Sequence, residues 1–329
     1  MRKRIIWIAP LVLLAGGWLF ARSKGVEGFA WLGLPAQQAE EGADDVPGPP
    51  LPPFERRGET IRIASFNIQV FGENKLARPE VTRVLVQIIR HFDVVAVQEI
   101  RAKTQDVLPQ LLELVNAEGA HYDFVIGPRL GRTSSKEQYA FIFDAASIEC
   151  DRESVYTVDD PDDLLHREPL VAGFRVRGPP TSEAFTFTLI DIHTDPDEIA
   201  TELNVLDDVF RAVRNDGRGE DDVILLGDLN SDDHHLGELG QMGYLTWAIS
   251  GVATNTRGTK LYDNVLFDTR ATTEYTGRAG VVDVLREFNL SMQQALAVSD
   301  HLPIWAEFTV REDSRPRSIA VRPKKNKAR

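Results

Sequence analysis

The chain is almost without cysteine. Cys150 is the single cysteine among 329 residues, which excludes an intramolecular disulfide. A zinc site built from several cysteines is excluded for the same reason. The lack of disulfides does not fix the compartment, because exported proteins can also do without them.

Positive charge is scarce in the body of the chain. The formal net charge is −13, yet residues 1–24 carry +5 and residues 311–329 carry +6. Residues 25–310 therefore carry −24, which is −13 less the +5 and +6 of the two ends. An acidic body is a poor passive binder of polyanions. We therefore expect several of these carboxylates to hold divalent cations.

One long apolar run lies near the amino terminus. Residues 5–20 are almost wholly apolar and follow Arg2-Lys3-Arg4. This pattern is typical of a signal peptide or a membrane anchor, although a spanning helix usually needs about 17–25 residues. The absence of an A-x-A-like cleavage site favours an uncleaved anchor. We expect residues 1–24 to anchor an exported catalytic domain in a membrane, or else to direct its secretion.

Composition divides the rest of the chain into three parts. Residues 25–59 contain many Pro, Gly and acidic residues and predict a semi-extended linker. Residues 60–310 predict one large globular domain. Residues 311–329 are basic with almost no apolar content. They predict a disordered tail that either binds polyanions or only aids solubility.

Short apolar runs alternate with helical patterns in residues 60–310, which indicates the α/β class and a layered sandwich. The expected strands are Ile61–Phe66, Val94–Val97, Tyr122–Ile126, Tyr139–Phe143, Phe185–Ile192, Val223–Leu226, Asn264–Phe267 and Pro303–Phe308. The expected helices are Pro79–His91, Thr104–Asn116 and Pro196–Arg214. The third helix has Asp195 as its predicted N-cap and Pro196 at its first position.

Polar residues gather where the predicted strands begin or end. The six sites are Ser65-Phe66-Asn67, Gln98-Glu99, His193, Gly227-Asp228-Leu229-Asn230, Tyr262-Asp263 and Ser299-Asp300-His301. One acid at a strand end is common in turns, but six polar sites on one rim predict a metal site. Oxygen ligands from Asp, Glu and Asn suit hard cations such as Mg²⁺, Mn²⁺ or Ca²⁺. Such a cation can neutralise a phosphodiester, while histidines oriented by carboxylates move protons.

Five of these sites, in this order, resemble the endonuclease/exonuclease/phosphatase superfamily over roughly residues 61–309. The stretches Gly131–Tyr139, Arg167-Glu168-Pro169 and Ala297–His301 resemble its deoxyribonuclease I branch. The resemblance implies a four-layer α/β sandwich of two packed mixed β-sheets flanked by helices. It also implies divalent-metal-dependent cleavage of DNA by in-line attack of water, in one step. Two rival interpretations remain: a phosphodiesterase or phosphatase acting on phospholipids or small phosphoesters, and an inactive membrane-tethered binding module.

The resemblance implies a set of metal ligands. Glu99 would bind the principal cation, which is Mg²⁺ or Mn²⁺ with Ca²⁺ as the alternative. Asn67 and Asp300 would lie beside that cation. Asp228 and Asn230 would bind a second ion or orient the phosphate.

The resemblance also implies the groups that move protons and bind DNA. His193 would pair with Glu137, and His301 would pair with Asp263. One histidine would act as general base on water and the other as general acid on the leaving oxygen. The expected substrate-binding residues are Asn67, Arg101 and Ser135.

Three departures from the family pattern concern DNA and calcium. Ser135 stands where the family commonly places a tyrosine in the DNA minor groove, so we expect weaker reading of duplex DNA. The calcium loop at residues 252–256 lacks its acidic ligand, whereas a second could persist through Asp160, Asp163 and Glu168. The cluster at residues 232–235, Asp-Asp-His-His, is expected to be a helix start with exposed side chains rather than a metal site.

Overall fold

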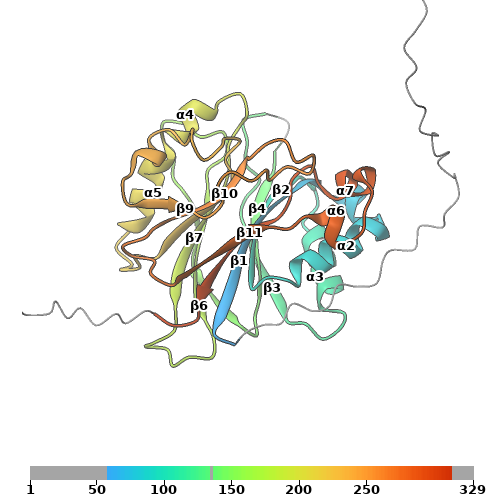
Figure 1. Ribbon diagram of the computed structural model, residues 1–329, viewed down its shortest axis with the longest axis horizontal. Helices are drawn as coiled ribbons and strands as arrows, with labels where there is room; N and C mark the ends of the chain where they lie inside the picture. Colours follow the sequence, from blue (N-terminus) through green and yellow to red (C-terminus); the bar gives the residue numbers. More distant parts are fainter. Residues whose placement is uncertain (1–57, 134–135, 313–329) are drawn as a thin grey trace, which may run out of the picture. The chain divides into compact units, whose positions relative to one another are not determined.

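The computed structural model describes residues 58–133 and 136–312, which contain two six-stranded mixed sheets (Figure 1). The first sheet has the order β11-β12-β1-β2-β4-β3. Its strands are β1 Thr60–Phe71, β2 Val94–Ile100, β3 Tyr122–Ile126, β4 Gln138–Asp144, β11 Tyr275–Val281 and β12 Ile304–Thr309. The second sheet has the order β5-β6-β7-β8-β10-β9. Its strands are β5 Ile148–Thr157, β6 Leu170–Val176, β7 Thr186–His193, β8 Val223–Asp228, β9 Leu245–Trp247 and β10 Asp263–Asp268.

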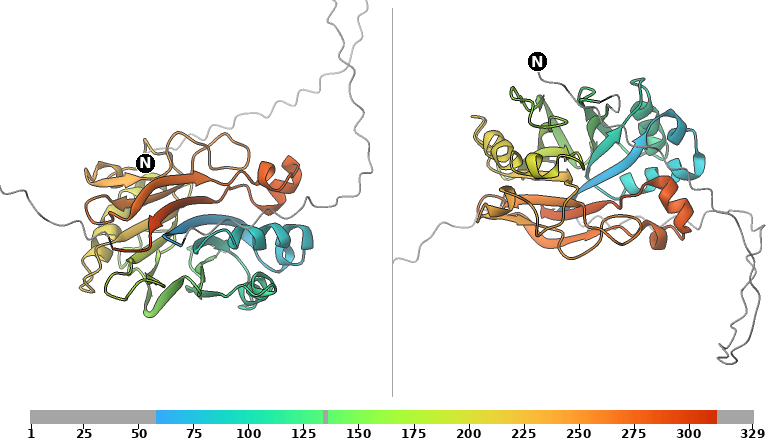
Figure 2. Two further views of the ribbon diagram at one scale, coloured as in Figure 1. Left: turned by 60° about the horizontal axis from the view of Figure 1, so that its bottom comes forward. Right: turned by 90° about the horizontal axis from the view of Figure 1, so that it is seen from above.

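Helices cover the outer face of each sheet (Figures 1 and 2). Those beside the first sheet are α1 Glu73–Leu76, α2 Pro79–Ile89, α3 Val107–Asn116, α6 Val284–Glu287 and α7 Met292–Val298. Those beside the second sheet are α4 Ile199–Leu203 and α5 Leu206–Arg214, and a single 3₁₀ turn, η1, spans Leu239–Gln241. The resulting order of layers is helix, sheet, sheet, helix. This arrangement confirms the predicted four-layer α/β sandwich.

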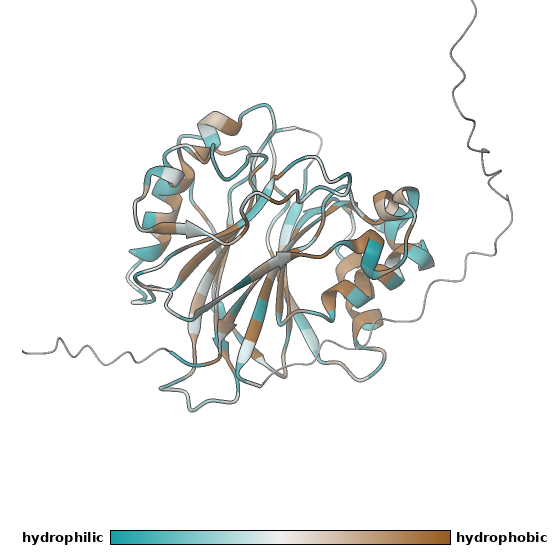
Figure 3. Cartoon of the chain, viewed as in Figure 1, coloured by the Kyte–Doolittle hydropathy of each residue, from teal (hydrophilic) through white to brown (hydrophobic). Residues whose placement is uncertain are grey.

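Alternation along the central strands divides the apolar residues among three cores. Ile61 and Ile63 of β1 face the core between the sheets, whereas Ala64 and Phe66 face the helices of the first sheet. The second sheet is divided in the same way between the central core and the core under α5. Because successive side chains of a strand point to opposite faces, a strand buried on both faces has a continuous apolar run. Figure 3 shows hydrophobic segments along the strands of the two sheets.

Most of the predicted elements are confirmed. The eight expected strands correspond to β1, β2, β3, β4, β7, β8, β10 and β12, and two of the expected helices correspond to α2 and α3. The four remaining strands, β5, β6, β9 and β11, were not predicted. Polar and exposed residues in the middle of β5, at positions 151–153, and the glycine-containing β11 hide the usual strand signal.

The predicted helix Pro196–Arg214 is wrong in its continuity and in its N-cap. It is two helices, α4 and α5, and α4 begins after Glu198 rather than after Asp195. The side chain of Asp195 instead accepts a hydrogen bond from the Asp197 amide at 2.9 Å, which makes a turn before the helix. The break allows the ends of both helices, Leu203 and Leu206, to be buried in the same core.

The predicted helix start at residues 232–235 is also wrong. These residues form a turn, and the nearest helical segment is η1. Asp232 is the reason, because its Oδ1 accepts the His234 amide at 3.0 Å and contacts His235 Nδ1 at 2.6 Å. Such local side-chain bonds compete with helix formation.

Strand directions bring the predicted polar sites to one end of the sandwich. β1 runs parallel to β2, and β7 runs parallel to β8. β12 is antiparallel to β1, and β10 is antiparallel to β8. The carboxyl ends of β1, β2, β7 and β8 therefore lie with the amino ends of β10 and β12. In register, Asp228 is opposite His193 on one side and Asp263 on the other.

Several sequence predictions concern residues outside the described ones. These are the anchor or signal at residues 1–24, most of the linker, and most of the basic tail. The strands begin at Thr60 and end at Thr309, within the predicted domain at residues 60–310. No helix among the described residues is long and apolar enough to cross a membrane.

Candidate active site

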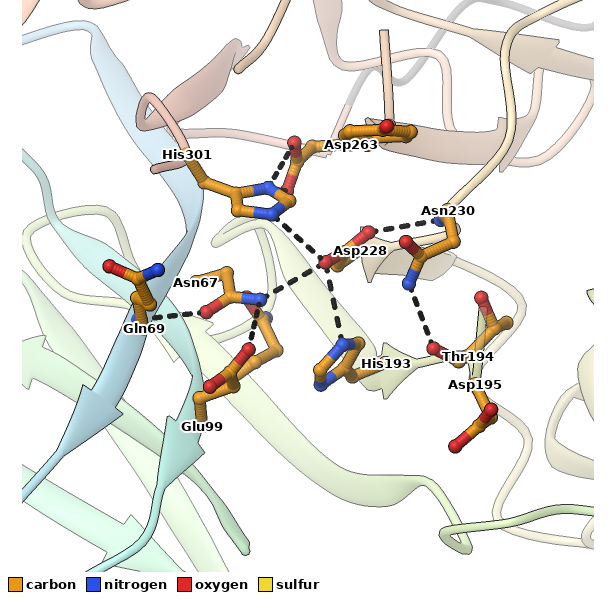
Figure 4. Close-up of polar contacts among 12 residues, drawn as sticks. Asn67, Gln69, Glu99, His193, Thr194, Asp195, Asp228, Asn230, Asp263 and His301 are labelled. Carbon is orange, nitrogen blue, oxygen red and sulfur yellow. Dashed lines mark hydrogen bonds and ion pairs between the residues drawn. The ribbon is translucent and has the colours of Figure 1, made fainter. Parts of the chain in front are cut away.

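Asp228 lies at the centre of the polar cluster, at the end of β8 (Figure 4). Its side-chain oxygen Oδ2 is 3.5 Å from His193 Nε2 and 3.4 Å from His301 Nε2. The same oxygen accepts a hydrogen bond from Asn67 Nδ2 at 3.0 Å. Asp228 is only 1% exposed. One buried carboxylate thus faces two imidazoles and an amide from both sheets.

His193 is the last residue of β7, and other side chains bind both its imidazole and its backbone. Its Nδ1 lies 2.7 Å from Glu137 Oε1, so Nε2 faces Asp228. Arg167 donates to the His193 carbonyl from Nε at 3.1 Å, and the Tyr139 hydroxyl accepts the His193 amide at 3.0 Å. Although burial opposes it, Glu137 raises the pKa of His193. The partner charge therefore favours the imidazolium form.

His301 forms the matching pair on the other side of Asp228. Its Nδ1 lies 2.9 Å from Asp263 Oδ2, and Thr254 Oγ1 donates to the same oxygen at 2.6 Å. Its backbone amide donates to Ser299 Oγ at 3.0 Å. Burial opposes charging of this imidazole, but Asp263 and Asp228 raise the pKa of His301 to about 11. The two carboxylates therefore favour the protonated form of His301.

Glu99 and Asn67 lie on the first-sheet side of Asp228. Asn67 Nδ2 donates to Glu99 Oε1 at 3.2 Å, and the Val70 amide donates to Glu99 Oε2 at 2.9 Å. Gln69, Val70 and Glu99 all have positive φ angles, of 45°, 51° and 62°. Such conformations are unfavourable for these residue types and concentrate at functional sites. The chain is bent here so that Glu99 meets the end of β1.

Arg101 lies against two carboxylates of the cluster. Its Nη2 is 3.1 Å from Glu99 Oε2 and 3.7 Å from Glu137 Oε2, and its side chain is 29% exposed. The predicted substrate-binding arginine is thus close to the predicted metal ligand. Ser135, another predicted substrate contact, lies outside the described residues.

The remaining predicted ligands are Asp300 and Asn230. Asp300 Oδ1 is buried and has no hydrogen-bond partner, which suits an oxygen reserved for a cation. The Asn230 side-chain nitrogen Nδ2 donates to the Thr194 carbonyl at 2.9 Å. The side-chain oxygen of Asn230 therefore points away from that carbonyl. The structure therefore brings together all the described residues of the predicted site. Their oxygen-rich donor set fits a hard divalent cation.

Asp163 of the second predicted calcium loop is engaged by an arginine. Arg132 Nε donates to Asp163 Oδ1 at 3.1 Å, and Asp160 Oδ2 accepts the Leu165 amide at 2.7 Å. Among the described residues, the clusters of three closely spaced metal-ligating side chains do not include Asp160, Asp163 or Glu168. These contacts lend no support to the calcium site expected there.

Lys75 is a partly buried lysine beside the site, and the sequence analysis missed it. Its Nζ donates to the carbonyls of Ile68, Gln69 and Val298, at 2.7, 2.5 and 2.8 Å. Burial lowers the pKa of Lys75 to about 8, while Glu99 and Asp300 oppose that shift. Lys75 therefore ties the bent end of β1 to the segment that carries Asp300. No sequence pattern signals this role, because Lys75 lies in a helix of four residues.

Replacing Lys75 by methionine should lower the free energy of unfolding by about 2–3 kcal/mol, because three backbone carbonyls lose a charged donor. Urea unfolding of the full-length chain measures this change. Lys103→Met, at an exposed position, is the matched control. Equal stability of the two variants would show that these carbonyls are satisfied without Lys75.

Comparisons with known proteins agree with this geometry. The profile of the Endonuclease/Exonuclease/phosphatase family matches residues 64–301. The chain is 33% identical to Deoxyribonuclease-1-like 2 of Mus musculus over 264 residues, covering 75% of this chain and 91% of that protein. It is 34% identical to Deoxyribonuclease-1-like 1 of Bos taurus over 259 residues, covering 75% and 80%. The fold is similar to that of the human Nocturnin catalytic domain with bound sulfate anion, with a TM-score of 0.52, 15% identity, and coverage of 78% and 98%.

Proposed function

Because this chain belongs to the Endonuclease/Exonuclease/phosphatase family, we propose that it is a deoxyribonuclease I-like endonuclease that cleaves DNA with a divalent cation. Family membership makes the chain a phosphodiester-hydrolysing enzyme. The observation that carries the proposal is the placement of His193 and His301, whose Nε2 atoms lie within 3.5 Å of one oxygen of Asp228. The names of the relatives above support DNA as the substrate.

The cation proposed here is Mg²⁺ or Mn²⁺, with Ca²⁺ as the alternative. Glu99, Asn67 and Asp300 would hold it, while Asp228 and Asn230 would bind a second ion or the phosphate. When bound, the cation would neutralise the phosphodiester and stabilise the negative charge that develops on its oxygens. The unpartnered, buried Oδ1 of Asp300 supports this assignment.

The proposed proton transfers use the two carboxylate-paired imidazoles. Glu137 and Asp263 each bind an Nδ1 atom, which leaves both Nε2 atoms directed at the site. The histidine that acts as base must be neutral, and its Nε2 then accepts a proton from water as the water oxygen bonds to phosphorus. The other donates a proton to the oxygen whose bond to phosphorus breaks. No covalent intermediate is required.

The proposed substrate path extends from Asp228 past Asn230. A cavity of about 720 Å³ is lined by Asn230 and Tyr262, together with Asp232, Asp233, His234, His235 and Lys260. His235 is engaged by Asp232, so Lys260 is the positive charge that this cavity offers to the phosphates of a bound strand. Arg101 would contact the substrate at the other side, beside Glu99.

The exported, membrane-tethered or secreted location is also part of the proposal, on the basis of the basic and apolar pattern of residues 1–24. The test adds a protease to intact cells with a permeable outer envelope. Full protection of the domain from cleavage would contradict the proposed location.

A panel of substrates tests the proposed activity. The full-length chain is incubated with plasmid DNA, RNA, phospholipid vesicles and bis(p-nitrophenyl) phosphate, each with Mg²⁺, Mn²⁺, Ca²⁺ or EDTA. We expect nicking and then linearisation of the plasmid with a cation and none with EDTA. An Asp228→Asn preparation controls for contaminating nuclease. Hydrolysis of phospholipid with intact plasmid would instead favour the lipid phosphodiesterase, and a folded chain inactive on every substrate would favour the binding module.

A further inference from the structure

The loop between β5 and β6, residues 158–169, carries an arginine that contacts one of the two His–carboxylate pairs. Arg167 Nε lies 3.3 Å from Glu137 Oε1 and donates to the His193 carbonyl at 3.1 Å. Leu165 and His166, which precede Arg167, are buried as well. Any shift of this loop therefore moves a side chain that touches both members of the Glu137–His193 pair.

Arg132 binds this loop through every nitrogen of its guanidinium. Its Nε donates to Asp163 Oδ1 at 3.1 Å, and its Nη2 donates to the carbonyls of Asp163 and Leu165, the latter at 3.0 Å. Its Nη1 donates to Glu198 Oε2 at 2.6 Å, in the residue that precedes α4. A planar guanidinium with five donors suits several oxygens that are held in one place. Arg132 therefore joins the loop to the start of α4.

The loop oxygens that meet Arg132 are of the kind that Ca²⁺ binds in proteins. One is a carboxylate oxygen of Asp163, and the other two are the backbone carbonyls of Asp163 and Leu165. The sequence predicts a calcium site in this loop through Asp160, Asp163 and Glu168. Asp160 Oδ2 instead accepts the Leu165 amide at 2.7 Å, and Asp163 faces the guanidinium. The chain itself thus supplies a positive charge to these oxygens.

A buried carboxylate of α4 connects the same loop to the end of β7. Glu202 is 2% exposed, and its Oε1 accepts the His166 amide at 2.6 Å. Its Oε2 accepts the Asp195 amide at 2.8 Å. His166 is the neighbour of Arg167, and Asp195 lies two residues after His193. The loop is therefore fixed relative to His193 on one side by Glu202 and on the other by Arg132.

We propose that Arg132 takes the place of a calcium ion in this loop and is a positioning residue for the Glu137–His193 pair, acting through Arg167. This role rests on the proposed function, because it assumes that His193 transfers a proton. The side chains of Arg132 and Asp163 are 28% and 72% exposed. Ion pairs so open to water contribute little to the free energy of unfolding. Arg132 therefore acts mainly on the geometry of the site.

Thermal unfolding tests the replacement of calcium without any substrate. The full-length Glu99→Gln chain, in a mild nonionic detergent, lacks the main cation ligand proposed at the candidate active site. In this chain Asp163→Asn should leave the Tm difference between Ca²⁺ and EDTA unchanged. Adding Arg132→Gln frees the three loop oxygens, so about 10 mM Ca²⁺ should raise the Tm by roughly 3–10 °C more than in the parent. Asp163→Asn should remove that gain.

Hydrolysis of bis(p-nitrophenyl) phosphate at saturating Mg²⁺ tests the positioning role. Arg132→Gln should lower kcat by about 10-fold with little change in KM, because a small displacement of a catalytic group can cost up to about 10²-fold. In an Arg167→Met chain, or in Arg167→Lys if the first does not fold, Arg132→Gln should have no further effect. Arg152→Gln is the matched control, since Arg152 is exposed and pairs with Asp123.

Three results would overturn the proposal. Asp163→Asn could reduce the response of the Arg132-containing chain to Ca²⁺, which would place calcium in the loop beside Arg132. The Arg132→Gln chain could gain no response, which would mean that the loop oxygens form no cation site. Arg132→Gln could also have the kcat of the Arg152→Gln control. The thermal results can be read even in a chain that hydrolyses nothing, so this inference and the proposed function can fail separately.

Discussion

Asp228→Asn should lower kcat for plasmid cleavage by ~10³-fold or more while the protein stays folded. Asparagine has the same shape, but it carries no charge toward His193 and His301, whose Nε2 atoms lie 3.5 and 3.4 Å from Asp228 Oδ2. Groups that transfer protons usually contribute about 10²–10⁴-fold, and here one substitution disturbs two of them together with a proposed metal ligand. Initial rates of plasmid nicking at saturating cation measure the loss.

Alanine variants of the histidines separate their contributions. His193→Ala and His301→Ala should each lose at least ~10²-fold. The matched control is His121→Ala, because His121 is exposed and precedes β3 at the opposite end of the sheet. Circular dichroism confirms that each variant is folded. A folded His193→Ala variant that nicks plasmid at the rate of the control would remove His193 from the mechanism.

Gly227→Ala should prevent stable folding, with a loss of more than about 4 kcal/mol in the free energy of unfolding. Gly227 has φ +147°, and a Cβ atom there would lie 1.9 Å from the Ile192 carbonyl oxygen. That oxygen cannot move away easily, since Ile192 and Gly227 are paired in register in the centre of the second sheet. Soluble yield and urea unfolding of the full-length chain measure the effect.

Two other glycines separate the causes of this loss. Gly178 has φ +109° with nothing within 4 Å of an added Cβ, so Gly178→Ala should cost about 1 kcal/mol from backbone strain alone. Gly243 has open space and no positive φ, so Gly243→Ala should be neutral. If Gly227→Ala proved no worse than Gly178→Ala, the close approach of β7 and β8 would not be the controlling factor.

The strands that could be predicted from sequence are those buried on both faces. β2 and β8 have continuous apolar runs, because both faces of each strand lie in a core. β5 could not be predicted in the same way, because it is the edge strand of its sheet and its middle is exposed and charged. The break between α4 and α5 depends on the tertiary packing of Leu203 and Leu206. The helical spacing of apolar residues in the sequence does not predict this packing.

The candidate site could also be predicted only in part from the sequence. The polar rim could be predicted, because parallel strands place their ends together and side chains such as Asp228 follow apolar runs. The two His–carboxylate pairs came from the family resemblance, and the structure places their members in contact while their roles stay a prediction. Lys75 could not be found, because its surroundings are built from residues far away in the chain. Lys75 contacts the carbonyl of Val298.

The position of β12 in the first sheet has a consequence for the timing of activity during synthesis. β12 follows every other described strand in the chain, yet it lies between β11 and β1, and the turn before it carries Asp300 and His301. A nascent chain that ends before residue 299 exposes the side of β1 that β12 covers, and it lacks one of the two imidazoles. Such a chain therefore lacks a complete candidate site. The first and the last strands of the domain must meet before a complete site exists.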